Sequence, residues 1–536
     1  MQNLLPNLWH FTSTLTGTQH PVNSYVVLTP YGPVLIDPAA DLTPAALSAI
    51  PEINPADIKH ILITHLHAEN AAGCANFPAA LVHLPPGDEF LATGRAAYEA
   101  LDLTWFAPWD WGSRGNFRGH VAGARNERPT EQPLRLGEPL HPAYNMLGFT
   151  TLATPGHGKS AVTLITQLGD KTVAFSGDLV YAGGRLWNWF DCDWDYGPQT
   201  GQLALLASAT RLAQEKLDLL CPTHGPIITD PAPTLQKLCD RLQKILHPTP
   251  STLNTDRFVA PVTPGPTPDF IQVSPHLLVW CNIWGNCAVV LSDSGNALMI
   301  DDGLCQWIPH KQRTARHRQA MTDLKKACGI KHIELVIPTH YHGDHTENIP
   351  ELVALEAETG GSGGGNTQVV CLATVAEPIE HPERFNLGCP LPWYGCVHNT
   401  VRIDRKLAAD TTFPWREYQV EIFHLGGQTF YTNGIQITID GRRTIFVGDS
   451  LGGPSPECEP ILTYNDADPA TRGWTYALDI LLPRRPDTLV CGHGPVLTDP
   501  HDLLVYKRAS WDKRLADFAA LSAQTPLRRF FDPFFS

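Results

Sequence analysis

The chain reads Ile337-Pro338-Thr339-His340-Tyr341-His342-Gly343-Asp344-His345 directly after an apolar run, Ile333 to Ile337, that predicts a buried strand. Three histidines and one aspartate fall within six positions. Unpaired titratable groups are costly to bury at the end of a core strand, so a bound metal explains this cluster best. His340 and His342 lie two apart on an extended segment and point the same way, whereas Asp344 and His345 follow the turn at Gly343. The spacing H-x-H-x-D-H therefore predicts donors for two adjacent cations.

An altered version of this motif lies earlier in the chain. Ile61 to Ile63 predicts a strand that ends in Thr64-His65-Leu66-His67-Ala68-Glu69-Asn70, with glutamate in place of the aspartate and asparagine in place of the last histidine. Each motif is followed by a polar residue in a turn, an aspartate at a strand end and a histidine at a strand end. These later positions are His157, Asp178 and His224 in the first copy, and Gln428, Asp449 and His493 in the second. A similar pair of strands, ending in Asp37 or Asp301, precedes each motif, so we interpret the chain as two copies of one fold.

The order of these motifs resembles the signature of the metallo-β-lactamase fold hydrolases. The resemblance implies an α/β (α+β) chain of two tandem metallo-β-lactamase-like αβ/βα sandwiches, each with two mixed sheets face to face and helices outside. The expected domains are residues 1–247 with the degenerate H-x-H-x-E-N motif and residues 269–536 with the intact H-x-H-x-D-H motif. Residues 248–268, which are rich in proline, are expected to be the linker.

The resemblance also implies the metal ligands. In this family, one metal takes the H-x-H pair and the histidine of the later turn. A second metal takes the following aspartate and histidine with the final histidine, and the later aspartate bridges both. The expected ligands are His65, His67, His157, Asp178 and His224 in the first copy, and His340, His342, Asp344, His345, Asp449 and His493 in the second.

Two positions depart from the family pattern in opposite copies. Glu69 and Gln428 are expected to be weak ligands, and His424 could replace Gln428, although a role outside the metal sphere is the favoured interpretation of His424. Asn70 is a poor ligand, so we expect the first copy to hold one metal; the alternative is a decayed domain kept for packing.

The predicted function is a metal-dependent hydrolase that uses a metal-bound hydroxide to cleave an ester, thioester, lactone or related bond. Two cations could share a water, lower its pKa towards neutrality and polarise a carbonyl or phosphoryl oxygen. Asp344 could take and return a proton, which makes it the expected catalytic residue, while Asp37 and Asp301 are expected to orient ligands. The expected cofactor is Zn²⁺, one or two ions per competent site, with the main site in the C-terminal copy.

Two other functions stay open. A mononuclear iron dioxygenase of the persulfide dioxygenase kind resembles this fold with one iron, which His65, His157 and Asp178 could hold. A binding or scaffold protein with relic sites is the other alternative. Metal analysis would separate them: zinc favours the hydrolase, iron favours the oxygenase, and metal-free protein favours the scaffold.

Composition restricts the partners. The 536 residues are 43% hydrophobic and 17% charged, and the formal net charge of -15 argues against nucleic acid or an anionic membrane, so a small-molecule substrate is expected. The 13 scattered cysteines, the absence of signal-peptide features at the N-terminus and the absence of a membrane span predict a cytoplasmic protein. Cys389 and Cys396 flank a short aromatic loop, but a disulfide between them is not favoured. The sequence does not indicate an oligomeric state.

The sequence does not identify substrate-binding residues. Three segments are expected to form the walls of the pocket: Trp105–Pro139, Leu186–Tyr196 and Gly360–Arg416. Their aromatic residues, among them Trp105, Trp109 and Trp111, suit an apolar or ring-bearing substrate, but they could also form a hydrophobic cluster under long loops.

Overall fold

The computed structural model describes residues 1–14, 21–94, 132–142, 144–187, 200–247, 253–280, 285–303, 310–359, 366–384, 398, 400–451 and 473–523. The chain forms two compact units. Unit 1 contains the described residues up to 247 together with the end of helix α13 from Ala516, and unit 2 contains those from 253 to Leu515. Some predictions fall outside the described residues: the three tryptophans 105, 109 and 111, most of segment 186–196, residues 360–365 and 385–397 of segment 360–416, and the cysteine pair 389 and 396.

Unit 1 is built on two sheets. The first has six strands in sequence order: β1 (Gln2–Leu5), β2 (Leu8–Thr14), β3 (Pro21–Thr29), β4 (Gly32–Ile36), β5 (His60–Leu62) and β6 (Leu81–His83). It is antiparallel up to β4 and parallel from β4 to β6. The second sheet has the order β11 (Leu219–Pro222), β10 (Lys171–Gly177), β9 (Val162–Leu168), β8 (Phe149–Ala153) and β7 (Asn145–Met146), in which only β10 and β11 are parallel.

Alternation along the strands gives the first sheet two buried faces. Val27 and Val34 point to one side and join a core that includes Phe175 of the second sheet. Val26 and Leu35, one position along, point to the other side and pack with residues of the 42–77 segment. Successive side chains of a strand face opposite ways, so this pattern places the two sheets face to face, with short helices behind the first.

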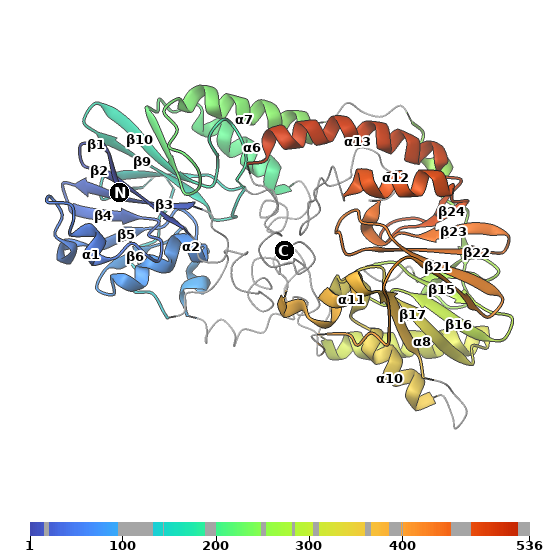
Figure 1. Cartoon of the computed structure of the whole chain (residues 1–536). Helices are drawn as coiled ribbons and strands as arrows, with labels where there is room; N and C mark the ends of the chain where they lie inside the picture. Colours follow the sequence, from blue (N-terminus) through green and yellow to red (C-terminus); the bar gives the residue numbers. More distant parts are fainter. Residues whose placement is uncertain are drawn as a thin grey trace. The chain divides into compact units, whose positions relative to one another are not determined.

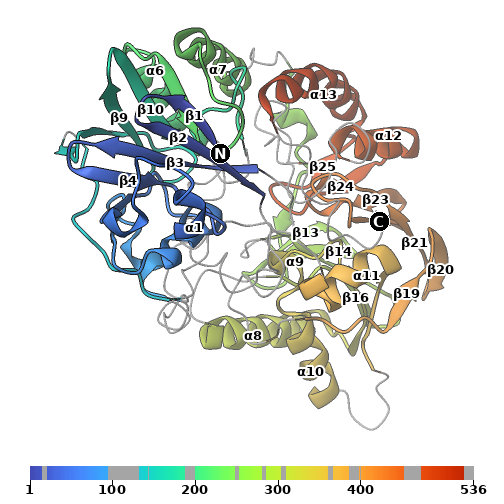
Figure 2. The ribbon, with the colours of Figure 1, turned by 60° about the vertical axis from the view of Figure 1, so that its left-hand side comes forward.

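The helices of unit 1 lie outside the sheets, as Figures 1 and 2 show for α6 and α7 beside β9 and β10. They are α1 (Pro44–Leu47), α2 (Ala68–Ala71), α6 (Thr200–Leu212) and α7 (Pro231–Leu246), with 3-10 turns at Pro55–Asp57, Ala72–Asn76 and Glu89–Ala92. Helix α1 is short, with four residues. The side chain of Thr43 caps it by accepting a hydrogen bond from Ala46 N, and Pro44 suits the first turn because no amide donor is needed there.

One piece of unit 1 comes from the far end of the sequence. Leu186 pairs with the end of helix α13 (His501–Leu521) and the residues that follow it: its amide donates to Leu521 O at 2.8 Å, and its carbonyl accepts from Ala523 N at 2.9 Å. Unit 1 is therefore not continuous in sequence.

Unit 2 repeats the two-sheet plan with more strands. The first sheet has eight in sequence order: β12 (Thr263–Pro264), β13 (Phe270–Ser274), β14 (Leu277–Trp280), β15 (Cys287–Leu291), β16 (Asn296–Ile300), β17 (His332–Ile337), β18 (Gln368–Leu372) and β19 (Arg405–Leu407). The second has six: β20 (Thr411–Trp415), β21 (Tyr418–His424), β22 (Asn433–Ile439), β23 (Arg442–Phe446), β24 (Thr488–Val490) and β25 (Leu497–Thr498). One hydrophobic core joins them. Part of the segment expected as a linker packs into this unit, since β12 pairs with β13 and Phe258 is buried.

The longer helices of unit 2 also cover the outside of its sheets. Figure 1 shows α8 and α10 together beside the first sheet, and α12 beside the second. The bounds are α8 (His310–Cys328), α9 (Gly343–Thr346), α10 (Ile349–Thr359), α11 (Ala373–Glu380) and α12 (Trp474–Arg484), with 3-10 turns at Asp256–Phe258, Pro382–Arg384 and Gly448–Ser450. The mixed α/β fold class predicted from the sequence is thus confirmed.

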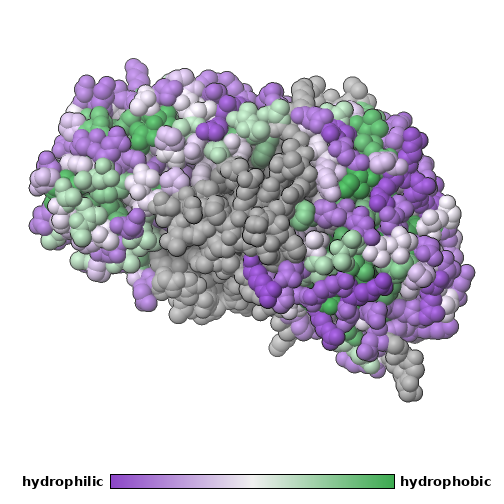
Figure 3. Space-filling view, in the orientation of Figure 1, coloured by the Kyte–Doolittle hydropathy of each residue, from purple (hydrophilic) through white to green (hydrophobic). Residues whose placement is uncertain are grey.

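The described surface and helices bear on the question of a membrane span. The described residues visible in Figure 3 are a mixture dominated by hydrophilic side chains. None of the described helices is both long and apolar enough to cross a membrane.

Candidate metal centres

The histidines and aspartates of each unit gather where parallel strands end. In unit 1 the motif 64–70 follows β5, Asp178 follows β10 and His224 follows β11; in unit 2 the motif 339–345 follows β17, Asp449 follows β23 and His493 follows β24. Because β4 and β5, like β16 and β17, run parallel, their carboxyl ends meet at one edge of the sheet.

A buried aspartate orients the first histidine in both units. Thr64 donates from its backbone N to Asp37 Oδ1 at 2.8 Å and from Oγ1 to Asp37 Oδ2 at 2.7 Å, and its hydroxyl also lies 3.0 Å from His65 Nδ1. The hydroxyl proton goes to the carboxylate, so Oγ1 accepts from Nδ1–H and the lone pair of His65 stays on Nε2. Asp301, Thr339 and His340 repeat this chain of contacts.

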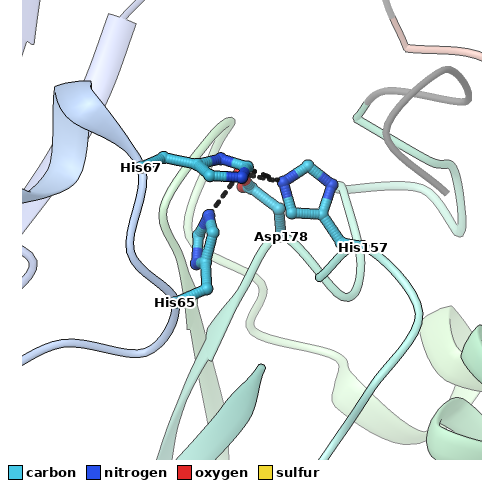
Figure 4. Close-up of side chains that lie close together, drawn as sticks. All are labelled: His65, His67, His157 and Asp178. Carbon is cyan, nitrogen blue, oxygen red and sulfur yellow. Dashed lines mark hydrogen bonds and ion pairs between the residues drawn. The ribbon is translucent and has the colours of Figure 1, made fainter. Parts of the chain in front are cut away.

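Four donor atoms of unit 1 converge on one point (Figure 4). His65 Nε2 lies 3.4 Å and His157 Nε2 lies 3.5 Å from Asp178 Oδ2, and His157 Nε2 lies 3.4 Å from His67 Nδ1. Ligand atoms that sit about 2.0–2.1 Å from a tetrahedral ion are roughly 3.3–3.4 Å apart. These separations are longer than good hydrogen bonds and suit the edges of a tetrahedron, so the four residues fit a metal ion.

The electrostatics of this group also suit a cation. Burial holds the pKa of His67 well below its usual value and lowers that of His157 to about 3, so both imidazoles are neutral, as ligands must be. Burial alone would lower the pKa of His65 and raise that of Asp178. The contact between the two side chains outweighs burial and raises the pKa of His65 to about 9, while His224 and His65 keep Asp178 ionised.

The remaining predicted residues of unit 1 lie beside this group rather than in it. His224 Nδ1 is 2.9 Å from both oxygens of Asp178, and His224 Nε2 is 4.0 Å from Glu69 Oε1. Both oxygens of Glu69 are buried without a hydrogen bond in the described structure, and burial raises its pKa to about 7. Asn70 binds the backbone instead: its Nδ2 donates to His65 O at 2.7 Å, and its Oδ1 accepts from His67 N at 3.0 Å.

Unit 2 brings its donors into two groups that share Asp449. One consists of His340, His342 and Asp449, and the other of Asp344, His345, Asp449 and His493. His340 Nε2 is 3.7 Å from Asp449 Oδ2, and His345 Nε2 is 3.3 Å from Asp449 Oδ1. His493 Nε2 lies 3.4 Å from Asp449 Oδ2 and 3.3 Å from Asp344 Oδ2. Nε2 of His340, Nε2 of His345 and Oδ1 of Asp449 are buried and make no hydrogen bond among the described residues, so these atoms fit cation ligands.

Burial and the neighbouring imidazoles set the charges of this second group. Burial, together with His345 and His342, holds the pKa of His340 well below its usual value, and burial lowers the pKa of His342 to about 4. Burial would raise the pKa values of Asp344 and Asp449, but the adjacent histidines hold both well below their usual range. Both carboxylates are therefore ionised and available to a cation.

The structure does not bring His424 to the third position expected for the first metal of unit 2. His424 lies outside both groups, since its Nε2 is 2.7 Å from Phe430 O and its Nδ1 is 3.3 Å from Tyr476 OH. Gln428 Oε1 is buried without a hydrogen bond in the described part of the chain. Its turn packs on the residue after Asp449, because Ser450 Oγ donates to Gly426 O at 2.5 Å.

Asn70 and Thr223 distinguish the centre of unit 1 from that of unit 2, and of these two the sequence did not single out Thr223. In unit 2, Asp301 Oδ2 accepts from His345 Nδ1 at 2.9 Å, and a Cβ on Gly492 would lie 2.7 Å from His345 Cε1. In unit 1, Asn70 stands where His345 stands in the motif, and Thr223 stands where Gly492 precedes the last histidine. The Thr223 hydroxyl donates to Asp37 Oδ2 at 2.8 Å and so replaces the imidazole N–H. The motif positions could have indicated this exchange, but the contacts that explain it appear only in the fold.

Helix α8 holds the segment after His345 by buried charges, which the sequence also did not indicate. Arg313 Nη2 lies 3.1 Å from Glu347 Oε1, and His317 Nε2 lies 2.9 Å from Asp302 Oδ2. Asp302 N in turn donates to His345 O at 3.0 Å. Helix α8 thus holds the backbone of His345 in place through His317 and Asp302.

Comparisons with known proteins agree with this fold. Residues 17–224 match the family model described as the Metallo-beta-lactamase superfamily. That part of the chain is therefore a metallo-β-lactamase superfamily domain, and membership suggests a hydrolase. The match ends at residue 224, so unit 2 lies outside it.

Solved structures of low identity are also similar. One is a metallo-beta-lactamase with a HARLDQ motif from Cronobacter sakazakii, with 14% identity, a TM-score of 0.36, and coverage of 50% of this chain and 99% of that one. A metallo-beta-lactamase family protein from Thermus thermophilus has 22% identity and a TM-score of 0.33, over 45% of this chain and 81% of that one. A subclass B3 metallo-beta-lactamase of Bradyrhizobium japonicum has 16% identity and a TM-score of 0.34, over 50% of this chain and 99% of that one. These values are too low to transfer an activity, and no curated protein is significantly similar to the chain.

Proposed function

We propose that unit 2 is a second copy of the superfamily fold and a metal-dependent hydrolase of an ester, thioester, lactone or related bond. The observation that carries this proposal is the pair of donor groups that meet at Asp449. One carboxylate between two sets of imidazoles is an arrangement for two neighbouring divalent cations, and the nitrogen and oxygen donors suit zinc.

The residues that would hold the cations are His340, His342 and Asp449 for one, and Asp344, His345, Asp449 and His493 for the other. Cations held there would polarise the scissile carbonyl and lower the pKa of a bound water. Asp344 is placed for proton transfer, since its carboxylate is ionised and belongs to the same donor group as Asp449 and His493. Asp301 holds the ring of His345 through Nδ1 and leaves Nε2 for the ion.

Access supports unit 2 as the main site. The side chain of His493 is 41% exposed, so its group can be reached from solvent. Catalytic metal sites keep a position open for water or substrate, whereas every donor of the four-residue group in unit 1 is buried. The fourth donor, His67, also argues for zinc in unit 1 over the open two-histidine, one-carboxylate triad of an iron oxygenase.

Matched double variants of the full chain test this proposal. His340→Ala with His342→Ala should remove one metal ion and reduce hydrolysis of p-nitrophenyl acetate, a thioester or a lactone by about 100-fold or more, because the loss of two ligands weakens metal binding steeply. His65→Ala with His67→Ala makes the same change in unit 1. If the unit 1 variant loses the activity and the unit 2 variant keeps it, the main site is in unit 1 and the proposal is refuted. If neither variant changes turnover, the metal-dependent mechanism is refuted.

A further inference from the structure

The four-donor group of unit 1 connects the two sheets of that unit. His65 and His67 follow β5 of the first sheet, whereas His157 follows β8 and Asp178 follows β10 of the second. An ion held by all four would cross-link loops from both sheets at one end of the sandwich. This is the position in which a bound metal contributes most directly to stability, because the separate loops come together only in the folded state.

The group is also closed. His65, His67, His157 and Asp178 are each at most 4% exposed. Trp187 lies flat against His224, with ring centroids 4.1 Å apart and planes 8° apart, and His224 binds both oxygens of Asp178. The described structure therefore encloses the carboxylate on the side that faces His224.

The second donor group of unit 2 has no counterpart among the described residues of unit 1. Thr223 occupies the place of Gly492 and satisfies Asp37, and Asn70 ties down the backbone of His65 and His67. Glu69 and His224 belong to none of the donor groups found among the described residues. With Asn70 in place of a histidine and Thr223 in place of a glycine, the side chains of Asp37 and Asn70 still make hydrogen bonds. A site that had merely lost its ligands would be expected to leave such buried groups unsatisfied.

We infer that unit 1 binds a single structural zinc ion through His65, His67, His157 and Asp178, and that this ion stabilises unit 1 instead of carrying out catalysis. Four protein donors complete a tetrahedral shell and leave no position for water or substrate, which distinguishes structural from catalytic zinc sites. The inference concerns unit 1 alone and does not depend on hydrolysis by unit 2.

Hydrogen exchange on the full-length protein tests the inference without an activity assay. Zinc-loaded and chelator-treated protein would be compared by mass spectrometry, with peptides covering 60–67 and 171–178 as reporters of unit 1 and peptides covering 442–451 and 488–493 as reporters of unit 2. Free zinc at 100 times its Kd should slow exchange through unfolding of unit 1 by roughly 100-fold. Unit 1 should also keep its ion longest when chelator is added. The inference is overturned if chelation leaves the unit 1 reporters unchanged, or if unit 1 loses its ion as fast as unit 2.

Two variants define the ligand set. His157→Ala should bind one fewer zinc ion per chain and show, with zinc present, the fast exchange of chelated unit 1. Glu69→Gln removes the other buried acid of this region and should retain the zinc content of the unaltered protein. Loss of zinc in Glu69→Gln would overturn the single closed site. If His157→Ala does not fold, the chelation experiment on the unaltered protein still decides the question. Since neither readout involves turnover, an inactive unit 2 would leave the result intact.

Discussion

Gly492 packs closely against the candidate centre of unit 2, and this leads to a quantitative prediction. A Cβ at this position would lie 2.0 Å from Asp449 Oδ1 and 2.7 Å from His345 Cε1. Real Cβ atoms essentially never approach other heavy atoms within 3.0 Å, so Gly492→Ala must move the shared carboxylate by roughly 1 Å. Metal–ligand distances tolerate about 0.2 Å. The carboxylate therefore cannot stay in place for both donor groups.

The expected result is a large loss of metal affinity with a moderate loss of stability. Overpacking of this kind costs about 1–3 kcal/mol of unfolding free energy. Indirect disturbance of a ligand already lowers metal affinity by about 10–100-fold, and displacement of a shared ligand should do at least as much to both ions. Competition with a chromogenic chelator measures the affinity, and elemental analysis gives the number of ions per chain.

Gly158→Ala is the matched control for Gly492→Ala. Among the described residues its added methyl group would meet only Ala161 Cβ, at 4.0 Å, so it makes the same chemical change without a close contact there. We expect this variant to keep the affinity of unit 2 for both ions. Full occupancy and unchanged resistance to the chelator in Gly492→Ala would refute the reasoning from close packing.

Three further predictions follow from the same geometry. Asn70→His alone should not add a metal ion to unit 1, because the side chain of Thr223 takes the space that Gly492 leaves open in unit 2, whereas Asn70→His combined with Thr223→Gly should add one. Elemental analysis counts the ions, and an extra ion in the single variant would contradict this packing argument. Gln428→His should tighten one cation site of unit 2 by about 1–3 kcal/mol, since an imidazole replaces a weak donor, and calorimetric titration should show no change at the other site or in unit 1. Arg313→Met should destabilise unit 2 by about 3–5 kcal/mol, because it removes the guanidinium that faces the buried carboxylate of Glu347. Recovery of the melting temperature when Glu347→Leu is added would confirm this cause, and a melting temperature unchanged by Arg313→Met would disprove the prediction.

The fold could be predicted from local patterns because each pattern depends on neighbours in the sequence. Strand alternation, visible in Val26 and Val27, assigns side chains to the two faces of a sheet and needs no knowledge of the partner sheet. Motif spacing likewise placed His340 and His342 on one side of an extended segment. The mixed α/β architecture follows from these local rules, and the structure confirms it.

The rest of the site depends on contacts between residues distant in the sequence. Nothing near Asn70 reveals that Thr223 supplies the hydrogen bond that a histidine supplies in unit 2. The sequence favoured a role outside the metal sphere for His424 but left it as a possible replacement for Gln428, because both lie close to the expected position. Only the folded turn shows that the ring of His424 is bound to Phe430 O and Tyr476 OH.

The pairing of Leu186 with the residues after helix α13 has a consequence for synthesis on the ribosome. A domain near the N-terminus normally folds while the rest of the chain is still being made. Here Leu186 cannot form its hydrogen bonds until residues 521–523 have been made. The next residue in the chain is Trp187, whose ring stacks on His224 beside the donor group of unit 1. Unit 1 is thus made first but completed last. A chain shortened to end after residue 247 would contain unit 1 without its final hydrogen-bonded segment.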